Sequence, residues 1–103
     1  MNNLKGFQKK YLKGLAHALK PVVIIGQKGF TGSVARSLDE AFNSHELIKV
    51  KFIDFKEKAQ KQAIADEIVI KAGCETVGMI GHTAIFYRQH NNPKKRKIKL
   101  PEK

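Results

Sequence analysis

Four β-branched residues, Val22 to Ile25, form the most apolar run of the chain, and a glycine-bracketed turn follows them directly. A run this short, bounded by Pro21 and Gly26, predicts a strand that is buried on both faces rather than a helix. Gly26 and Gly29 bracket two polar residues, which we expect at an exposed tip because glycine lets the backbone reverse its direction. The fold must therefore contain a buried strand that leads into a tight turn.

Thr31, just after this turn, is a good N-cap for a helix predicted over about residues 32–43. The free N–H groups and the positive dipole end of a helix N-terminus suit an anion such as phosphate. A lone Gly-x-x-Gly pair is a weak signal, so a plain strand-to-helix connection that binds nothing explains it equally well. The candidate phosphate contacts are Gly26, Gln27, Lys28 and Gly29.

Helical spacing of apolar residues predicts two further helices. The first covers Leu4 to Leu15, carries a basic outer face and is expected to end near Gly14. The second covers Lys58 to Ala72 and is capped by Gly73. The basic face of the first helix is either a solvated face or part of a surface that tracks phosphates, and its residues are Lys5, Lys9 and Lys13.

Alternating polar and apolar residues predict three further strands, over Glu46–Ile53, Thr76–Ile80 and Thr83–Arg88. One face of the first of these strands carries two lysines and is expected to face solvent. Gly81 and His82 suit a two-residue hairpin between the last two strands. The order α-β-α-β-α-β-β predicts an α+β fold, a two-layer α/β sandwich with a mixed four-stranded sheet and three helices, although it does not set the strand order.

The chain of 103 residues carries a net charge of +11 that is confined to its two ends. Residues 1–28 contribute +6 and residues 94–103 contribute +5, while residues 29–93 sum to zero. Concentrated charge of one sign opposes folding, so we expect a polyanionic partner. An anionic membrane surface is the alternative, but a domain this small needs the apolar face of its first helix for its core, and we expect no membrane partner.

A chain of this length has room for one core, so we expect a single domain over residues 1–93 and a basic tail over residues 94–103. The first residues form no apolar signal segment, and no apolar run approaches the about 18 to 20 residues that span a bilayer. Cys74 is the only cysteine, which fits a reducing compartment. We therefore expect a cytoplasmic protein, with candidate contacts in the tail at Lys94, Lys95, Arg96 and Lys97.

The sequence contains no recognisable catalytic or metal-binding motif. Its four histidines lack the close pairing of a metal site. Gly-Gln-Lys-Gly is neither a dinucleotide-binding fingerprint nor a P-loop. We expect no enzyme activity, no cofactor and no small-molecule substrate, and a small nucleotide-using enzyme is the minor alternative.

Several blocks of sequence together are more specific than the glycine pair. In order and spacing, from about Leu4 to Pro101, they resemble the YhbY family of bacterial single-domain CRM proteins. The blocks are Leu-Lys-Gly-Leu-Ala-His at residues 12–17, Leu-Lys-Pro-Val-Val at 19–23, Gly-Gln-Lys-Gly at 26–29, Thr31, His-Glu-Leu-Ile-Lys-Val at 45–50, and Tyr87 with Arg88.

The resemblance implies an RNA-binding domain with a fold similar to the C-terminal domain of bacterial initiation factor three. It implies that the Gly26–Gly29 loop contacts RNA, by analogy with KH domains, and that His17 and Lys20 lie at matching motif positions. His17 is either an RNA contact or a structural residue that braces the loop. We expect a monomeric assembly factor that binds ribosomal RNA in precursors of the large subunit, with a permanent ribosomal protein and a general DNA- or RNA-binding protein as alternatives.

Two aromatic residues, Phe30 and Tyr87, are candidates for stacking on a base, but packing within the protein is the favoured interpretation for both. The run Lys94–Lys97 is denser in basic residues than the family pattern leads us to expect. How much of the affinity comes from the folded surface, rather than from the tail, therefore stays open.

Overall fold

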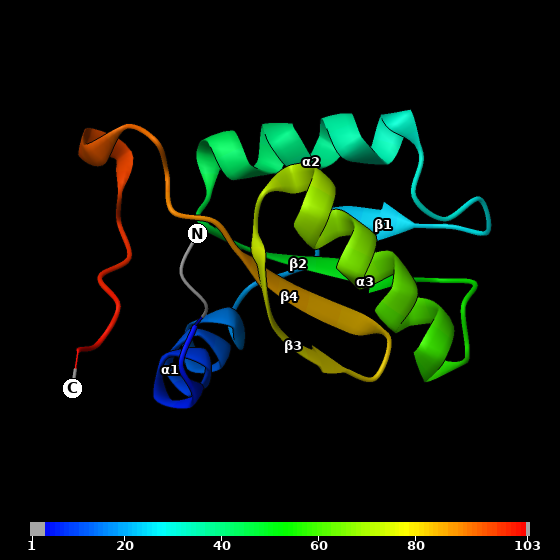
Figure 1. The fold of residues 1–103 in the computed structure, drawn as a ribbon, viewed down its shortest axis with the longest axis horizontal. Helices are drawn as coiled ribbons and strands as arrows, with labels where there is room; N and C mark the ends of the chain where they lie inside the picture. Colours follow the sequence, from blue (N-terminus) through cyan, green and yellow to red (C-terminus); the bar gives the residue numbers. More distant parts are fainter. Residues whose placement is uncertain (1–3, 103) are drawn as a thin grey trace.

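The computed structural model describes residues 4–102, which form a four-stranded sheet with three α-helices (Figure 1). This α+β class and the predicted order of elements are confirmed. No helix among these residues is long and apolar enough to cross a bilayer. The elements are α1 (Gly6–Ala16), β1 (Val23–Ile25), α2 (Gly32–Ser44), β2 (Leu47–Phe52), α3 (Lys58–Ala72), β3 (Glu75–Ile80), β4 (Thr83–Tyr87) and a short 3-10 helix, η1 (Pro93–Lys95).

The strands lie in the order β1-β2-β4-β3. β1 pairs in parallel with β2, whereas β4 runs antiparallel to both of its neighbours, so the sheet is mixed as predicted. The β3–β4 hairpin turns at Gly81 and His82, and Gly81 has a φ of 59°, which glycine adopts without strain. A register shift between Thr76 and Gly78 makes β3 irregular.

α2 and α3 lie on one face of the sheet and form the main core with it (Figure 1). Thr31 caps α2 as predicted, since its side-chain oxygen accepts a hydrogen bond from the Val34 N–H at 3.2 Å. Gly73 ends α3 in the left-handed region, at a φ of 65°. The buried members of this core are Val23, Ile25, Leu38, Phe42, Ile48, Val50, Phe52, Ala65, Ile68, Cys74, Ala84 and Phe86.

α1 covers part of the opposite face of the sheet and builds a second, smaller cluster there. Leu12 and Ala16 are fully buried against side chains from β2, β3 and β4. Because these two residues lie one turn apart and both pack on the sheet, α1 continues through Gly14 to Ala16 rather than ending at the glycine as predicted. Tertiary packing here outweighs the poor helix propensity of glycine.

β1 is not buried on both faces, so that prediction was wrong. Val23 and Ile25 are buried, but Val22 and Ile24 are 51% and 58% exposed. The reason is that β1 is an edge strand, and the helix on this face packs on the other strands instead. Ile24 therefore lies on a solvent-exposed part of the sheet, beside its register partner Lys51. Lys51 is exposed, as predicted for the lysine-bearing face of β2.

Candidate nucleic-acid interface

The Gly-x-x-Gly loop joins β1 to α2 and lies at an end of the molecule (Figure 1). Gln27 and Lys28 are exposed at its tip, and the Gly29 N–H donates to the Gly26 carbonyl oxygen at 2.9 Å to close the turn. Gly29 has a φ of 68°, so the turn requires glycine at this position. Lys28 makes no ion pair within residues 4–102, and its ammonium group is free to meet an anion.

An open groove of about 510 Å³ lies between this loop and the first turn of α2. Lys28 and Ser33 line it together with the backbone of the two glycines. The first N–H groups of a helix have no partner within the helix, and the positive end of the dipole favours negative charge there. Asp54 is the acid of this groove, with its Oδ2 3.6 Å from the position of a Cβ on Gly26.

The two glycines of the loop differ in what a side chain would cost. We expect Gly29→Ala to lower the free energy of unfolding by about 1 to 2 kcal/mol, because alanine is strained at a positive φ. Gly26→Ala is the matched control, since its Cβ would meet only ordinary contacts at 3.6 and 3.9 Å, and we expect a change within about 0.5 kcal/mol. Urea denaturation measures both free energies of unfolding. Equal losses in the two variants would contradict the conclusion that the turn requires glycine at position 29 but not at position 26.

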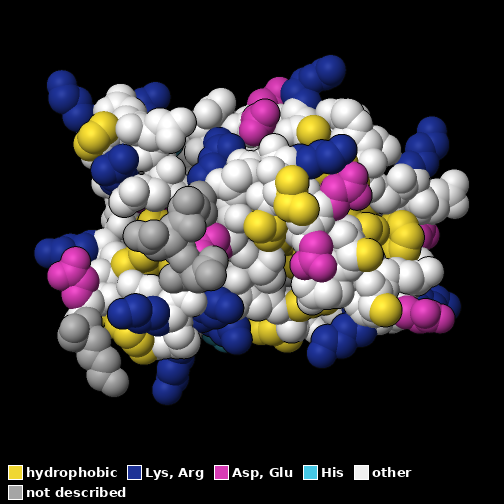
Figure 2. All heavy atoms as spheres, viewed as in Figure 1, with side chains coloured by type: hydrophobic (Ala, Val, Ile, Leu, Met, Phe, Trp, Pro, Cys, Tyr) yellow, Lys and Arg dark blue, Asp and Glu magenta, His cyan; other side chains and the backbone are white. Residues whose placement is uncertain are grey.

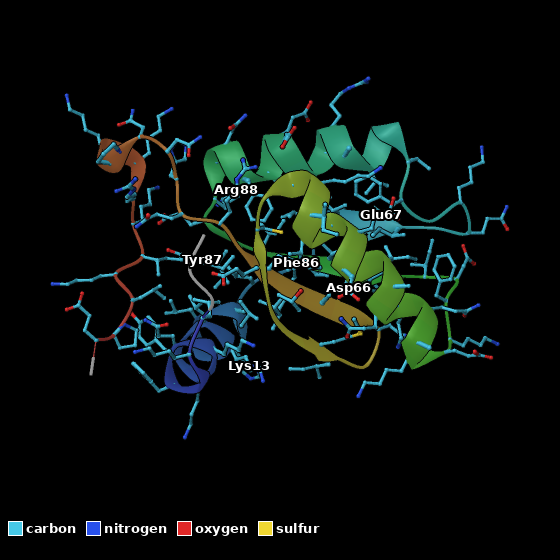
Figure 3. All side chains as sticks on the ribbon, viewed as in Figure 1. Lys13, Asp66, Glu67, Phe86, Tyr87 and Arg88 are labelled. Atoms are coloured by element: carbon cyan, nitrogen blue, oxygen red, sulfur yellow. The ribbon has the colours of Figure 1, made fainter. Side chains whose placement is uncertain are left out.

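The three predicted lysines of α1 do not form a uniform outer stripe. Lys5 and Lys13 are exposed, but Lys9 is half-buried in a hollow that it shares with the acids Asp66 and Glu75. The side chain of Lys13, labelled in Figure 3, lies over β3, where a Cβ added to its Gly78 would collide with the lysine Cε. The exposed positive charge of this helix therefore comes from Lys5, Lys10 and Lys13, with Lys9 set partly into the hollow.

His17 and Lys20 are both exposed in the segment that joins α1 to β1. This segment is held to the sheet because Lys49 Nζ donates to the Leu19 carbonyl oxygen at 3.0 Å. The imidazole of His17 makes no hydrogen bond to the Gly-x-x-Gly loop or to any other group among residues 4–102. A bracing role for His17 thus gains no support, and its contact with RNA stays a prediction.

The basic tail folds back onto the domain through the buried carboxylate of Glu46. Its Oε1 accepts from the N–H groups of Lys97 and Ile98 at 2.8 and 2.9 Å, and its Oε2 accepts from the His90 N–H at 2.9 Å. Burial raises the pKa of Glu46, but the three N–H donors and the nearby His90 outweigh it, so the pKa lies below its ordinary value. The predicted contacts Lys94, Lys95, Arg96 and Lys97 remain exposed, while Lys103 lies outside the described residues.

The structure separates the predicted contacts into two groups. The Gly26–Gly29 loop lies at one end of the 38 Å long axis, and η1 with the tail lies at the other (Figure 1). α1 belongs to the tail group, since Gln8 Nε2 donates to the Pro101 carbonyl oxygen at 3.3 Å. Figure 2 shows lysine and arginine side chains spread around the face in view, with acidic side chains between them. α1 and the basic tail thus lie together and away from the loop (Figure 1).

Both aromatic candidates for base stacking are packed within the protein, as favoured. Tyr87 is 3% exposed in the cluster under α1, and burial raises the pKa of its hydroxyl. Phe30 packs against the main core, with Lys71 Nζ 5.5 Å from the centroid of its ring. Tyr87 therefore has no ring face open to a base, and Phe30 is partly buried in the protein.

Within residues 4–102, no three or more His, Cys, Asp or Glu side chains gather to hold a metal ion. Sequence reasoning missed the structural role of Glu46, which holds the tail against the domain, because its local pattern indicates only the start of a strand. Its hydrogen-bond donors lie 44 to 52 positions further along the chain, so no local sequence pattern predicts these contacts.

A basic α+β domain with a mixed four-stranded sheet and a Gly-x-x-Gly turn at a helix N-terminus defines a recognisable class of small proteins. Residues 4–88 match the model of the CRS1 / YhbY (CRM) domain, and the chain belongs to this family. The resemblance drawn from the sequence blocks is thereby confirmed.

The relatives of this chain are similar over nearly their whole length. A Haemophilus influenzae protein named RNA-binding protein is 42% identical over 103 residues, which is all of both chains. A Bacillus subtilis protein, named probable RNA-binding protein YqeI, is 32% identical over 95% of this chain and 99% of its own. The solution structure of SAV1595 from Staphylococcus aureus, a hypothetical protein suggested to bind RNA, has a TM-score of 0.80 at 31% identity, covering 95% of this chain and 99% of its own.

Proposed function

We propose that this protein is a non-catalytic RNA-binding module, and that its target is ribosomal RNA in precursors of the large ribosomal subunit. The observation that carries the proposal is the exposed Gly26–Gly29 turn beside the N-terminus of α2, with Lys28 free at its rim. The names of the family relatives support RNA as the partner. The ribosomal target comes from the family resemblance described above.

The proposed mechanism uses the backbone of the loop to hold the backbone of the RNA. The N–H groups of the turn and of the first turn of α2 cradle phosphate oxygens, as a KH-type loop clamps a few nucleotides. Lys28 adds charge at the tip of the loop. The exposed lysines of α1 and of the tail add attraction that does not depend on sequence.

We further propose that the protein acts as a monomer in the cytoplasm and leaves the particle before it matures. Sedimentation of a cell extract through a sucrose gradient, followed by immunoblotting, tests whether the protein leaves the particle before it matures. An assembly factor is enriched in fractions that contain large-subunit precursors and depleted from mature ribosomes. Equal amounts on precursors and on mature subunits would instead identify a permanent ribosomal protein.

The tail lysines are expected to contribute to the salt dependence of RNA binding. Deleting the tail would also strip Ile98 and Leu100 from the cluster under α1, so substitution is the cleaner test. Replacing Lys94, Lys95 and Lys97 by Gln should lower the magnitude of the slope of log K against log salt by up to about 2, at about 0.7 for each phosphate that is no longer neutralised. Fluorescence anisotropy with a labelled ribosomal RNA fragment gives this slope.

The matched control removes the same charge from elsewhere on the surface. Arg36, Lys58 and Lys71 are exposed on α2 and α3, and replacing them by Gln should leave the slope nearly unchanged. A slope that falls equally in both triple variants would show that only the net charge matters. Duplex DNA competing as well as RNA would reduce the proposed function to general nucleic-acid binding.

A further inference from the structure

A hollow of about 610 Å³ lies at the tail end of the molecule, between the last turns of α1 and α2 and the folded-back tail. Its floor is apolar: Leu15 and Leu19 are each 40% exposed to solvent, and Leu47 and Ile98 lie beside them. The loop that was predicted to contact RNA does not contribute to it. The segments that line the hollow, the end of α2 and the tail, lie at the opposite end of the long axis from the loop (Figure 1), so the hollow is a separate feature.

The rim of this hollow is basic. Lys94, Lys95 and Lys97 come from the tail, and they bring three positive charges to one side of it. Glu46 is the acid of the lining, but it is 5% exposed and its carboxylate oxygens already accept three backbone N–H groups. The field over the leucines is therefore positive.

We propose that this hollow receives one unstacked nucleotide of the bound RNA, with its base over the leucines and its phosphate at the tail lysines. An apolar floor beside a cationic rim is complementary to a nucleotide, which joins a base with flat apolar faces to an anionic phosphate. A volume of about 610 Å³ falls within the range of small-ligand pockets. Proteins commonly read RNA through bases that are splayed out of single-stranded loops and bulges.

This inference rests on the proposed RNA binding and adds a second contact to it. The Glu46 hydrogen bonds to Lys97 and Ile98 form the tail wall of the hollow, so the site exists only while the tail is folded back. Asn43 also belongs to the lining, and His90 Nε2 lies 3.1 Å from its carbonyl oxygen, which holds the end of α2 against the segment that leads to the tail. The hollow is thus built by contacts on two of its sides before any RNA arrives.

The test compares two fluorescein-labelled RNA hairpins that are identical except for one unpaired nucleotide bulged from the stem. The wild-type protein should bind the bulged hairpin about fivefold more tightly than the plain hairpin. This preference lies at the low end of the range for a base stacked on an aromatic side chain, because the floor of the hollow is aliphatic. Ser44→Met places a longer side chain without an aromatic face in the hollow from the exposed last residue of α2, and it should abolish the preference without changing the charge.

Ser37→Met is the matched control, since Ser37 is exposed on the same helix two turns earlier and does not line the hollow. It should retain the preference, and circular dichroism checks that both variants are folded. Equal binding of the two hairpins by the wild type, or an unchanged preference in Ser44→Met, would overturn the nucleotide site while leaving the proposed function intact. Binding of neither hairpin would overturn both.

Discussion

Lys28→Glu is expected to weaken RNA binding roughly thirtyfold while the protein stays folded. At about 4 Å in water, a charge pair contributes about 1 kcal/mol, and reversing the charge replaces this attraction by a similar repulsion, for a total of about 2 kcal/mol. Lys28 is exposed and makes no ion pair within residues 4–102, so its replacement should not disturb the fold. Anisotropy titrations with a ribosomal RNA fragment measure the loss, and circular dichroism measures the fold.

Lys58→Glu is the control for this variant, because it changes the net charge by the same amount. Lys58 is the exposed first residue of α3 and lines neither the loop groove nor the hollow near the tail. We expect it to bind RNA with nearly wild-type affinity. If both variants lose the same affinity, the loop has no special role, and long-range attraction explains the binding.

Glu46→Gln is expected to lower the free energy of unfolding by about 2 to 3 kcal/mol and to release the tail. The carboxylate accepts three backbone N–H groups, and an amide in its place would point its own donor at one or more of them. Removing a charged acceptor and leaving a buried N–H without a partner accounts for a loss of this size. Urea denaturation gives the energy, and faster hydrogen exchange at Lys97 and Ile98 would report the release of the tail.

The same residue makes stability depend on pH. The pKa of Glu46 is lower in the folded protein than its ordinary value of 4.5, so the unfolded chain takes up the proton first as the pH falls. The stabilisation is fully present above the ordinary value and is lost as the pH falls through the lower folded value. Comparing denaturation at about pH 7 and about pH 3 should therefore show a smaller pH effect in Glu46→Gln than in the wild type.

Glu40→Gln is the control for both measurements on Glu46. Glu40 is exposed on α2 and makes no hydrogen bond within residues 4–102. It should keep the wild-type stability at neutral pH, the wild-type pH dependence and slow exchange at the tail amides. Glu46→Gln matching Glu40→Gln in all three would show that the tail is held by its apolar contacts alone.

Much of the fold was predictable because its signals are local. Thr31 caps α2 and Gly73 ends α3 through contacts within a few residues, and the period of the apolar residues separates helices from strands. The prediction for β1 was wrong because a run of four apolar residues does not distinguish a central strand, covered on both faces, from an edge strand with one solvent-exposed face. Burial of Ile24 depends on where α1 packs, which is a property of the tertiary structure.

The candidate site was predictable to the extent that it is continuous in sequence. The Gly26–Gly29 loop is such a segment, and the structure places its tip at the surface as expected. The wall of the hollow was not predictable, because it depends on hydrogen bonds that the Glu46 carboxylate accepts from the N–H groups of residues 51 and 52 positions away. Charge counts showed that both ends of the chain are basic, but only the folded chain shows that α1 lies beside the tail while Lys28 lies at the opposite end (Figure 1).

The distance between the loop and the tail bears on the choice of RNA ligand. The molecule is 38 Å long, so an RNA that contacts both the loop and the tail must span about that distance. An oligonucleotide much shorter than this can occupy one end or the other but cannot bridge them, so it would report only part of the affinity. Longer ligands gain from simultaneous engagement, because the second contact then forms at a high effective concentration.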